Sequence, residues 1–210
     1  MKLLGQLFGS QIRVKLMRLF LFHEGMSFSL EEILKRTLSK KDVVKKELKL
    51  LENVGFLKRG VLTLKEKKEL KSGKISLRKR KVVAWKLNPR FELKNPLKLL
   101  LIKTQLIREK DILSPIRKTG KLKLLVLSGI FVEREESEVD IMIVIDRVNK
   151  KNLEKAIRKM EAEIGKELLY TVFTPEEFRY RLDMYDKLVR DVLEHEKRVL
   201  FDKGEIHWNS

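Results

Sequence analysis

The sequence predicts an α+β protein with two domains. Its 210 residues exceed the ~100 to 150 of an average domain. Apolar residues recur at helical spacing in the first half, whereas the second half opens with apolar runs of the length and branching of buried strands. The charge is also divided: residues 1–110 hold 29 Lys and Arg against 10 Asp and Glu, and residues 111–210 hold 19 against 20.

The uneven charge indicates a polyanion-binding first half. The chain carries a net charge of +18, which divides into +19 for residues 1–110 and −1 for residues 111–210. Lys and Arg that face phosphates release condensed counterions, so a concentrated basic surface suits nucleic acid. A Lys-rich surface that serves only solubility or heat tolerance predicts compensating acids in the same half, and these are missing.

Composition excludes several classes of site and location. The chain has no cysteine, which rules out disulfides, thiolate metal sites and cysteine nucleophiles and is compatible with a reducing cytosol. The start of the chain does not read as a signal peptide. The richest apolar stretch, 97–102, includes Lys98 and stops at Lys103, far short of the ~20 residues that cross a bilayer. We therefore expect a cytoplasmic protein with no membrane partner.

Two helices are predicted near the N-terminus. The first begins at the N-cap Ser10 and ends near Gly25, with apolar residues at helical spacing between them. The second begins at Ser29, which forms a capping box with Glu32 three residues later, and ends near Leu38.

The third predicted helix presents a column of lysines. Ser39 is its expected N-cap, it runs from about 40 to 53, and Gly55 supplies its stop. Positions four apart lie on one face of a helix, so the lysines form a column that points away from an apolar stripe. The apolar face is Val44, Leu48 and Leu51, and the basic face is Lys41, Lys45 and Lys49. This pattern favours a recognition helix in a major groove; a solvated face is the alternative.

A basic hairpin is predicted after the third helix. Residues 56–59 and 81–87 read as two strands that flank a polar tip, in which Gly73 permits the turn. The tip carries a dense set of basic residues that can reach backbone phosphates beside a groove.

The order of three helices and a basic hairpin resembles the winged helix-turn-helix domains of ArsR-like and MarR-like transcriptional regulators, over roughly residues 8–90. The resemblance implies a DNA-binding domain at 1–92, double-stranded DNA as partner without any cofactor, and a homodimer. A connector helix is expected at 93–105. The residues expected to contact DNA are Lys40, Lys41, Lys45, Lys46, Lys49, Lys71, Lys74, Arg78, Lys79 and Arg80.

The second half contains a candidate metal site. A helix at 106–118 and a strand at 122–127 lead to Ser128 and Gly129, and a second strand is expected at 138–146. Residues two apart on a strand point to the same face, so Glu138 and Asp140 would project their carboxylates side by side. Mg²⁺ prefers such oxygen pairs. A pair of charges at a sheet edge is the alternative.

This stretch resembles the minimal nucleotidyltransferases of the DNA polymerase beta superfamily, over roughly residues 104–202. The resemblance implies a mixed α/β domain at 106–210 that ends in helices, a nucleotide at Ser128 and Gly129, and Mg²⁺ at Glu138 and Asp140 if the site is active. The chain departs from the family at three points: Ile130 follows the glycine, Glu138 replaces the usual Asp, and the strand expected at 168–173 carries no acid. A noncatalytic domain is therefore favoured.

The chain is expected to end in helices. Thr174 and Pro175 predict a helix start, and an apolar stripe continues from Phe178 to Leu193.

Three functions remain open at this point. The first is a DNA-binding regulator with a noncatalytic nucleotidyltransferase-like domain. The second is a Mg²⁺-dependent nucleotidyltransferase that modifies a protein or RNA, in the manner of toxin–antitoxin systems. The third is binding of structured RNA by the basic half.

Overall fold

The structure is a computed structural model that describes residues 2–69, 75–103, 109–134, 136–205 and 208. Within these ranges the side chains of residues 2, 65–69, 75–78 and 103 are not described. The chain forms two compact units, residues 1–104 with 162–166 and residues 105–161 with 167–210. Helices and two small sheets build the chain, so it is α+β as predicted.

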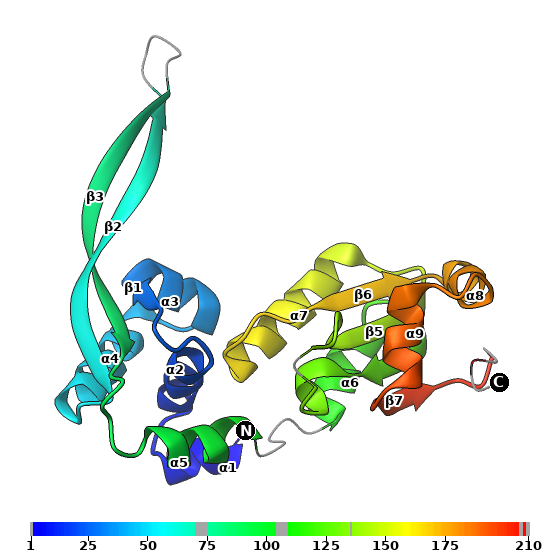
Figure 1. Cartoon of the computed structure of the whole chain (residues 1–210), viewed down its shortest axis with the longest axis horizontal. Coiled ribbons are helices and arrows are strands. Elements are labelled where there is room, and N and C mark those ends of the chain that lie inside the picture. Colours follow the sequence, from blue (N-terminus) through cyan, green and yellow to red (C-terminus); the bar gives the residue numbers. More distant parts are fainter. Residues whose placement is uncertain (1, 70–74, 104–108, 135, 206–207, 209–210) are drawn as a thin grey trace. The chain divides into compact units, whose positions relative to one another are not determined.

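The first unit combines helices with a three-stranded antiparallel sheet of order β1-β3-β2. Figure 1 shows β2 and β3 as a long twisted hairpin that extends away from the helices of this unit. Along the chain its elements are α1 (Lys2–Leu7), α2 (Gln11–Phe22), β1 (Ser27–Ser29), α3 (Leu30–Thr37), α4 (Lys41–Asn53), β2 (Leu57–Glu69), β3 (Ile75–Leu87), α5 (Lys94–Lys98) and the π-helical turn η1 (Leu99–Lys103).

Local capping explains where α2, α3 and α4 begin. Ser10 caps α2 through its side chain, and Ser29 and Glu32 form the full capping box of α3, so both predicted starts are confirmed. The predicted cap of α4 is wrong. Lys40 occupies the N-cap position without a side-chain hydrogen bond, because the Ser39 hydroxyl donates to the carbonyl of Thr37 (3.0 Å).

One face of α4 packs against the core of the first unit. Val44, Leu48 and Leu51 are buried, as predicted from their spacing. Burial of each such side chain contributes roughly 1.5–3 kcal/mol, which fixes the rotation of α4 about its own axis. Other buried members of this unit are Leu16, Leu19, Phe20, Ile33 and Phe56.

The hairpin is longer than the sequence predicted. Residues 57–69 and 75–87 pair one to one, from Leu57 opposite Leu87 to Glu69 opposite Ile75. Arg78, Lys79 and Arg80, which were expected in the tip, therefore lie in β3. A two-stranded ribbon has no buried face along most of its length, so the apolar alternation that marks a strand is absent there.

The second unit is built on a four-stranded sheet of order β6-β5-β4-β7. β5 is parallel to β6, and the other neighbouring pairs are antiparallel. The central strands β4 and β5 are almost entirely buried. The elements that follow η1 are α6 (Glu109–Arg117), β4 (Lys121–Leu127), the 3-10 turn η2 (Gly129–Phe131), β5 (Ile141–Asp146), α7 (Lys150–Ile164), β6 (Tyr170–Phe173), α8 (Pro175–Asp183), α9 (Lys187–Glu194) and β7 (Arg198–Asp202).

Two predictions for this unit are wrong in detail. The strand expected from Glu138 begins at Ile141, so Glu138 and Asp140 lie in the loop before β5. The helix expected to run from 174 to 193 is broken: Tyr185 adopts a left-handed φ of 53°, and Asp186 caps the new helix α9 with its side chain. No helix in the described part of the chain is long and apolar enough to cross a membrane.

Candidate nucleic-acid interface

The exposed face of α4 carries lysines without acidic partners. The side chains of Lys41, Lys45 and Lys49 are exposed and form a column beside the buried stripe of α4, and Lys40 and Lys46 are exposed too. Among the described residues none of the five forms an ion pair. At 1.5 Å per residue, the column from 41 to 49 is about 12 Å long. Each like-charged pair four residues apart costs roughly 0.2–0.5 kcal/mol, so this face is not arranged for stability.

Two of the acids of α4 are engaged by other elements of the first unit. Glu47 is buried. It accepts a hydrogen bond of 2.8 Å from Arg13 Nε of α2 and forms an ion pair with that guanidinium. Glu52 accepts a hydrogen bond from Trp85 Nε1 of β3 at 2.9 Å. Both carboxylates therefore bind neighbouring elements, while the third acid of α4, Asp42 in its first turn, is exposed and forms no ion pair among the described residues.

The hairpin adds further positive charge. Lys79 and Arg80 are exposed on β3, whereas the side chain of Arg78 is not described, and Lys71 and Lys74 lie outside the described residues. The register places Lys58 opposite Lys86, two exposed residues of like charge. Like charges directly opposite each other destabilise a strand pair. The Lys58–Lys86 pair, like the lysine column of α4, therefore does not contribute to the stability of the fold.

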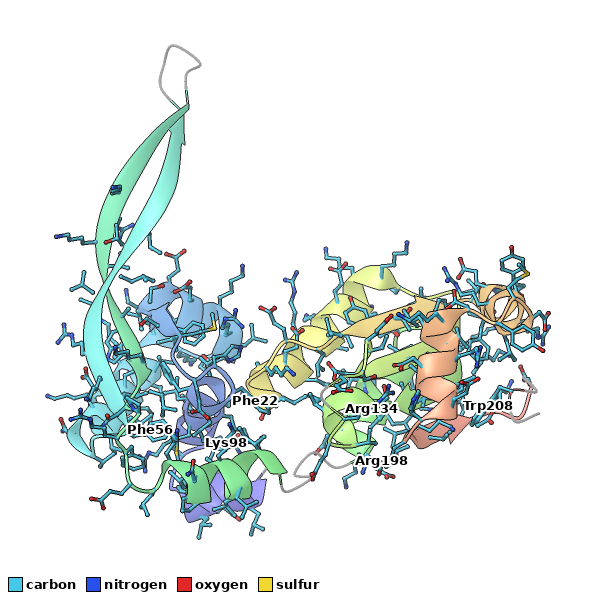
Figure 2. All side chains as sticks on the ribbon, viewed as in Figure 1. Phe22, Phe56, Lys98, Arg134, Arg198 and Trp208 are labelled. Carbon is cyan, nitrogen blue, oxygen red and sulfur yellow. The ribbon has the colours of Figure 1, made fainter. Side chains whose placement is uncertain are left out.

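The base of the hairpin is attached to the end of α4. The side-chain amide of Asn88 donates to the carbonyl of Gly55 (2.8 Å), and the backbone amide of Asn88 donates to the carbonyl of Phe56 (2.9 Å). Phe56 is buried at this junction (Figure 2). With the Trp85–Glu52 bond, these contacts fix the hairpin relative to α4. The base of the hairpin is therefore attached to the C-terminal end of α4 by three hydrogen bonds.

A groove of about 630 Å³ lies between α3, the start of α4 and the two strands of the hairpin. We call it the hairpin groove. Its apolar lining includes Leu30, Leu34, Leu64, Val83 and Trp85, none of which is fully buried. No sequence pattern indicates this groove, because its walls come from four separate segments.

The charged lining of the hairpin groove is predominantly basic. Lys41, Arg59, Arg80 and Lys81 contribute four cations, and Glu31 in the first turn of α3 contributes one carboxylate. Lys41, Arg59 and Lys81 form no ion pair among the residues that the structure describes. Lys41 and Arg80 belong to the predicted DNA-contacting set, and Lys81 follows Arg80 in the basic run predicted for the tip, whereas Arg59 was not predicted.

The predicted nucleotide-binding residues of the second unit make internal contacts. Ser128 is fully buried, and its hydroxyl bonds to the carbonyl of Val139 and to Ser137 Oγ. Gly129 has a left-handed φ of +53°, and a Cβ there would lie 2.2 Å from Asp140 Oδ1. A glycine is required at this turn because the Asp140 carboxylate packs against it.

The two predicted metal ligands lie in different surroundings. Asp140 is buried, with Oδ1 accepting from the amide of Ile130 (3.0 Å) and Oδ2 from the amide of Leu169 (2.9 Å). Glu138 is exposed and forms an ion pair with Lys187 (2.9 Å), and its carboxylate raises the pKa of that lysine. Each carboxylate has its own protein partners, so the arrangement does not fit a pair of oxygens offered to one Mg²⁺. No group of three or more His, Asp or Glu side chains in the described residues could hold a metal.

The loop before β5 is fastened to α9. Arg134 Nη2 pairs with Asp191 Oδ1 at 2.6 Å, and Arg134 Nη1 donates to the carbonyl of Asp191 at 3.1 Å (Figure 2). The Arg134 guanidinium lowers the pKa of Asp191 below its usual value. This loop is therefore a hydrogen-bonded part of the second unit.

No family model matches the chain, and no curated protein or solved structure matches it either.

Proposed function

We propose that the protein is a DNA-binding transcriptional regulator whose first unit works as a winged helix. The observation that carries this proposal is the column of unpaired lysines on α4, fixed beside a basic hairpin by hydrogen bonds at its base. The order α2-α3-α4 followed by β2-β3, with β1 added to the sheet, supports the winged-helix assignment.

The dimensions of α4 suit a major groove. A helix with its side chains is about 10–12 Å wide, and the major groove of B-DNA is about 12 Å wide. With Val44, Leu48 and Leu51 against the core, α4 can offer Lys41, Lys45 and Lys49 to the duplex while the hairpin contacts flanking phosphates. Lysine–phosphate contacts set affinity and orientation, whereas base contacts set sequence choice.

We assign a noncatalytic role to the second unit. The engagement of both Asp140 oxygens by backbone amides supports a structural carboxylate at the position where the resemblance implied a metal ligand. In this proposal the unit keeps a nucleotidyltransferase-like architecture and serves the regulator as a sensor or dimerisation module. A homodimer in the cytoplasm belongs to the same proposal.

The alternative is a Mg²⁺-dependent nucleotidyltransferase. Incubation of the full chain with labelled ATP, GTP, CTP or UTP, Mg²⁺ and a cell extract tests it. Transfer of label to protein or RNA that disappears in Asp140→Ala would replace our assignment of the second unit. The regulator proposal expects no transfer with any of the four.

The DNA-binding proposal is tested with a labelled random duplex and fluorescence anisotropy at several salt concentrations. Each phosphate contact contributes about 0.9 to the slope of log K against log salt. The double variant Lys45→Ala, Lys49→Ala is expected to lower the slope by about 2 and to weaken binding at least tenfold at low salt. Competition with unlabelled structured RNA distinguishes duplex DNA from RNA.

A matched control is available on α7. Lys155 and Lys159 have the same spacing and are also exposed, so Lys155→Ala, Lys159→Ala removes the same charge from another helix. We expect this variant to bind like the original protein. Equal losses in the two double variants would show that net charge, and not the face of α4, governs binding.

A further inference from the structure

The hairpin groove combines three kinds of lining residue. One part is apolar, with Leu34, Leu64, Val83 and the Trp85 ring, one part is cationic, and a single carboxylate stands at the first turn of α3. Its volume of about 630 Å³ falls within the roughly 300–1,000 Å³ of sites that hold small organic ligands. The ligand that suits this lining has a flat apolar part, a negative part and a hydrogen-bond donor.

Trp85 is held in place as a wall of the groove. Its indole Nε1 donates to Glu52 Oε1 (2.9 Å), so the only polar atom of the ring is already bonded. Trp85 lies opposite Arg59 in the strand register, and both line the groove. A fixed indole beside a guanidinium is a surface on which a nucleobase can stack.

The cationic side chains of the groove favour a ligand that carries negative charge. Arg59 and Lys81 line the groove without ion pairs among the described residues, and Lys41 stands at the start of α4. Guanidinium and ammonium groups are the usual partners of phosphate oxygens in proteins. The Glu31 carboxylate can accept hydrogen bonds from ribose hydroxyls or from an exocyclic amine.

We propose that the hairpin groove binds a free nucleoside phosphate, with its base beside Trp85 and its phosphates against Arg59 and Lys81. This site is separate from Ser128 and Gly129, and it does not depend on DNA binding. Because Lys41 and Arg80 belong both to the groove and to the proposed DNA surface, an occupied groove would compete with the duplex.

Calorimetric titration of the full chain with ADP, in the absence of DNA, is the first measurement. We expect saturable binding, and binding at least tenfold weaker for adenosine alone and for pyrophosphate alone. Pyrophosphate that binds as tightly as ADP would reduce the site to a simple anion site and overturn the proposal. If binding does not saturate up to about 1 mM ADP, the proposal is overturned as well, because a Kd above about 1 mM corresponds to less than about 4 kcal/mol of binding free energy.

Variants then locate the binding. Arg59→Ala, Lys81→Ala is expected to weaken ADP binding at least tenfold, and so is Val83→Phe, which fills the groove from an exposed strand position. The control Lys58→Ala, Lys86→Ala removes the same charge from the same strands outside the groove lining and should bind ADP normally. Equal losses in the groove variant and in this control would refute the location.

The chain has two tryptophans, so Trp208→Phe leaves Trp85 as the only indole reporter. In that variant we expect ADP to quench the fluorescence with the affinity measured by calorimetry, and unchanged fluorescence at saturation would place the ligand elsewhere. The Lys45→Ala, Lys49→Ala variant should bind ADP normally, which separates a failure of this proposal from a failure of the DNA-binding proposal.

Discussion

Trp85 Nε1 donates a hydrogen bond of 2.9 Å to Glu52 Oε1, and this bond connects β3 to the last turn of α4. Glu52→Ala removes the acceptor, and we expect a loss of about 1–3 kcal/mol in the free energy of unfolding. Urea unfolding followed by circular dichroism measures it. Glu52→Gln retains a carbonyl acceptor and should lose less.

The same pair of variants tests whether the bond orients the basic surface. Removal of an acid beside the lysine column by itself strengthens binding to a polyanion, so Glu52→Gln should bind the random duplex more tightly than the original protein. Glu52→Ala removes the same charge together with the bond, and we expect weaker binding than in Glu52→Gln. Identical affinities for the two variants would show that the bond has no part in DNA binding.

The register places Lys58 opposite Lys86 on the hairpin. Lys58→Glu converts a repulsive pair into an attractive one and is expected to raise the free energy of unfolding by about 0.2–1 kcal/mol. The variant also removes two units of positive charge from the proposed DNA surface, so duplex affinity should fall while stability rises. Lys58→Gln only removes the repulsion, so its free energy of unfolding should lie between those of the original protein and Lys58→Glu. A Lys58→Glu variant less stable than the original protein would contradict the pairing.

Gly129 and Asp140 are packed so closely that a Cβ at Gly129 would lie 2.2 Å from Asp140 Oδ1. With the left-handed φ of +53°, Gly129→Ala should cost more than about 1–3 kcal/mol in the free energy of unfolding, measured in urea. Gly204→Ala is the control, since Gly204 also has a positive φ (+73°) but a Cβ there would meet no atom within 4 Å.

A double-mutant cycle separates contact from backbone strain at this turn. Asp140→Ala alone leaves the amides of Ile130 and Leu169 without their acceptor and should cost about 0.5–1.5 kcal/mol for each. Combined with Gly129→Ala it should cost clearly less than the sum of the single changes, because the clash is gone. Additive costs would show that the two residues do not interact.

Asp191 gives the second unit a dependence on acid pH. The Arg134 guanidinium lowers the pKa of Asp191 in the folded state, so this stabilisation is fully present above the unfolded value of about 3.9 and is lost as pH falls through the lower folded value. Arg134→Met should therefore lower stability at neutral pH and flatten the fall in stability below about pH 4. Urea unfolding at a series of pH values measures both effects.

Arg181→Met is the matched control for this pH effect. The pKa of Asp186 is also lowered, but its largest cause is the backbone amide of Val189, which the substitution leaves in place. We expect the acid limb of its stability curve to stay close to that of the original protein. If the fall in stability below about pH 4 were flattened equally in both variants, the Arg134–Asp191 pair would not be the source of the pH dependence.

The sequence predicted the elements whose signals are local. The capping box of Ser29 with Glu32 and the α8 start at Thr174 lie within four residues each, and both are confirmed. α7 was not predicted, although Asn149 precedes it and apolar residues at helical spacing follow, with Leu153 and Ile157 buried. That helix could have been found from the same pattern.

Features that depend on distant partners were missed. β7 pairs with β4, which lies more than seventy residues earlier in the chain, so nothing near Arg198–Asp202 indicates it. The spacing of Glu138 and Asp140 suggested a strand with paired carboxylates. The amide of Leu169, 29 residues further on, takes one oxygen of Asp140 instead, and no local pattern predicts such a contact.

The length of the β2–β3 hairpin has a consequence for solubility. β2 is an edge of its sheet, and β1 covers β3 only from Ala84 to Lys86, so most of the ribbon has open backbone edges on both sides. Open edges invite pairing with the edges of other molecules, and charged residues, lysine above all, prevent it. The positive charges of the ribbon thus also protect the protein against aggregation. Replacement of several of these charged residues by apolar ones is expected to produce insoluble protein, so that the proposed DNA binding could not be tested with such a variant.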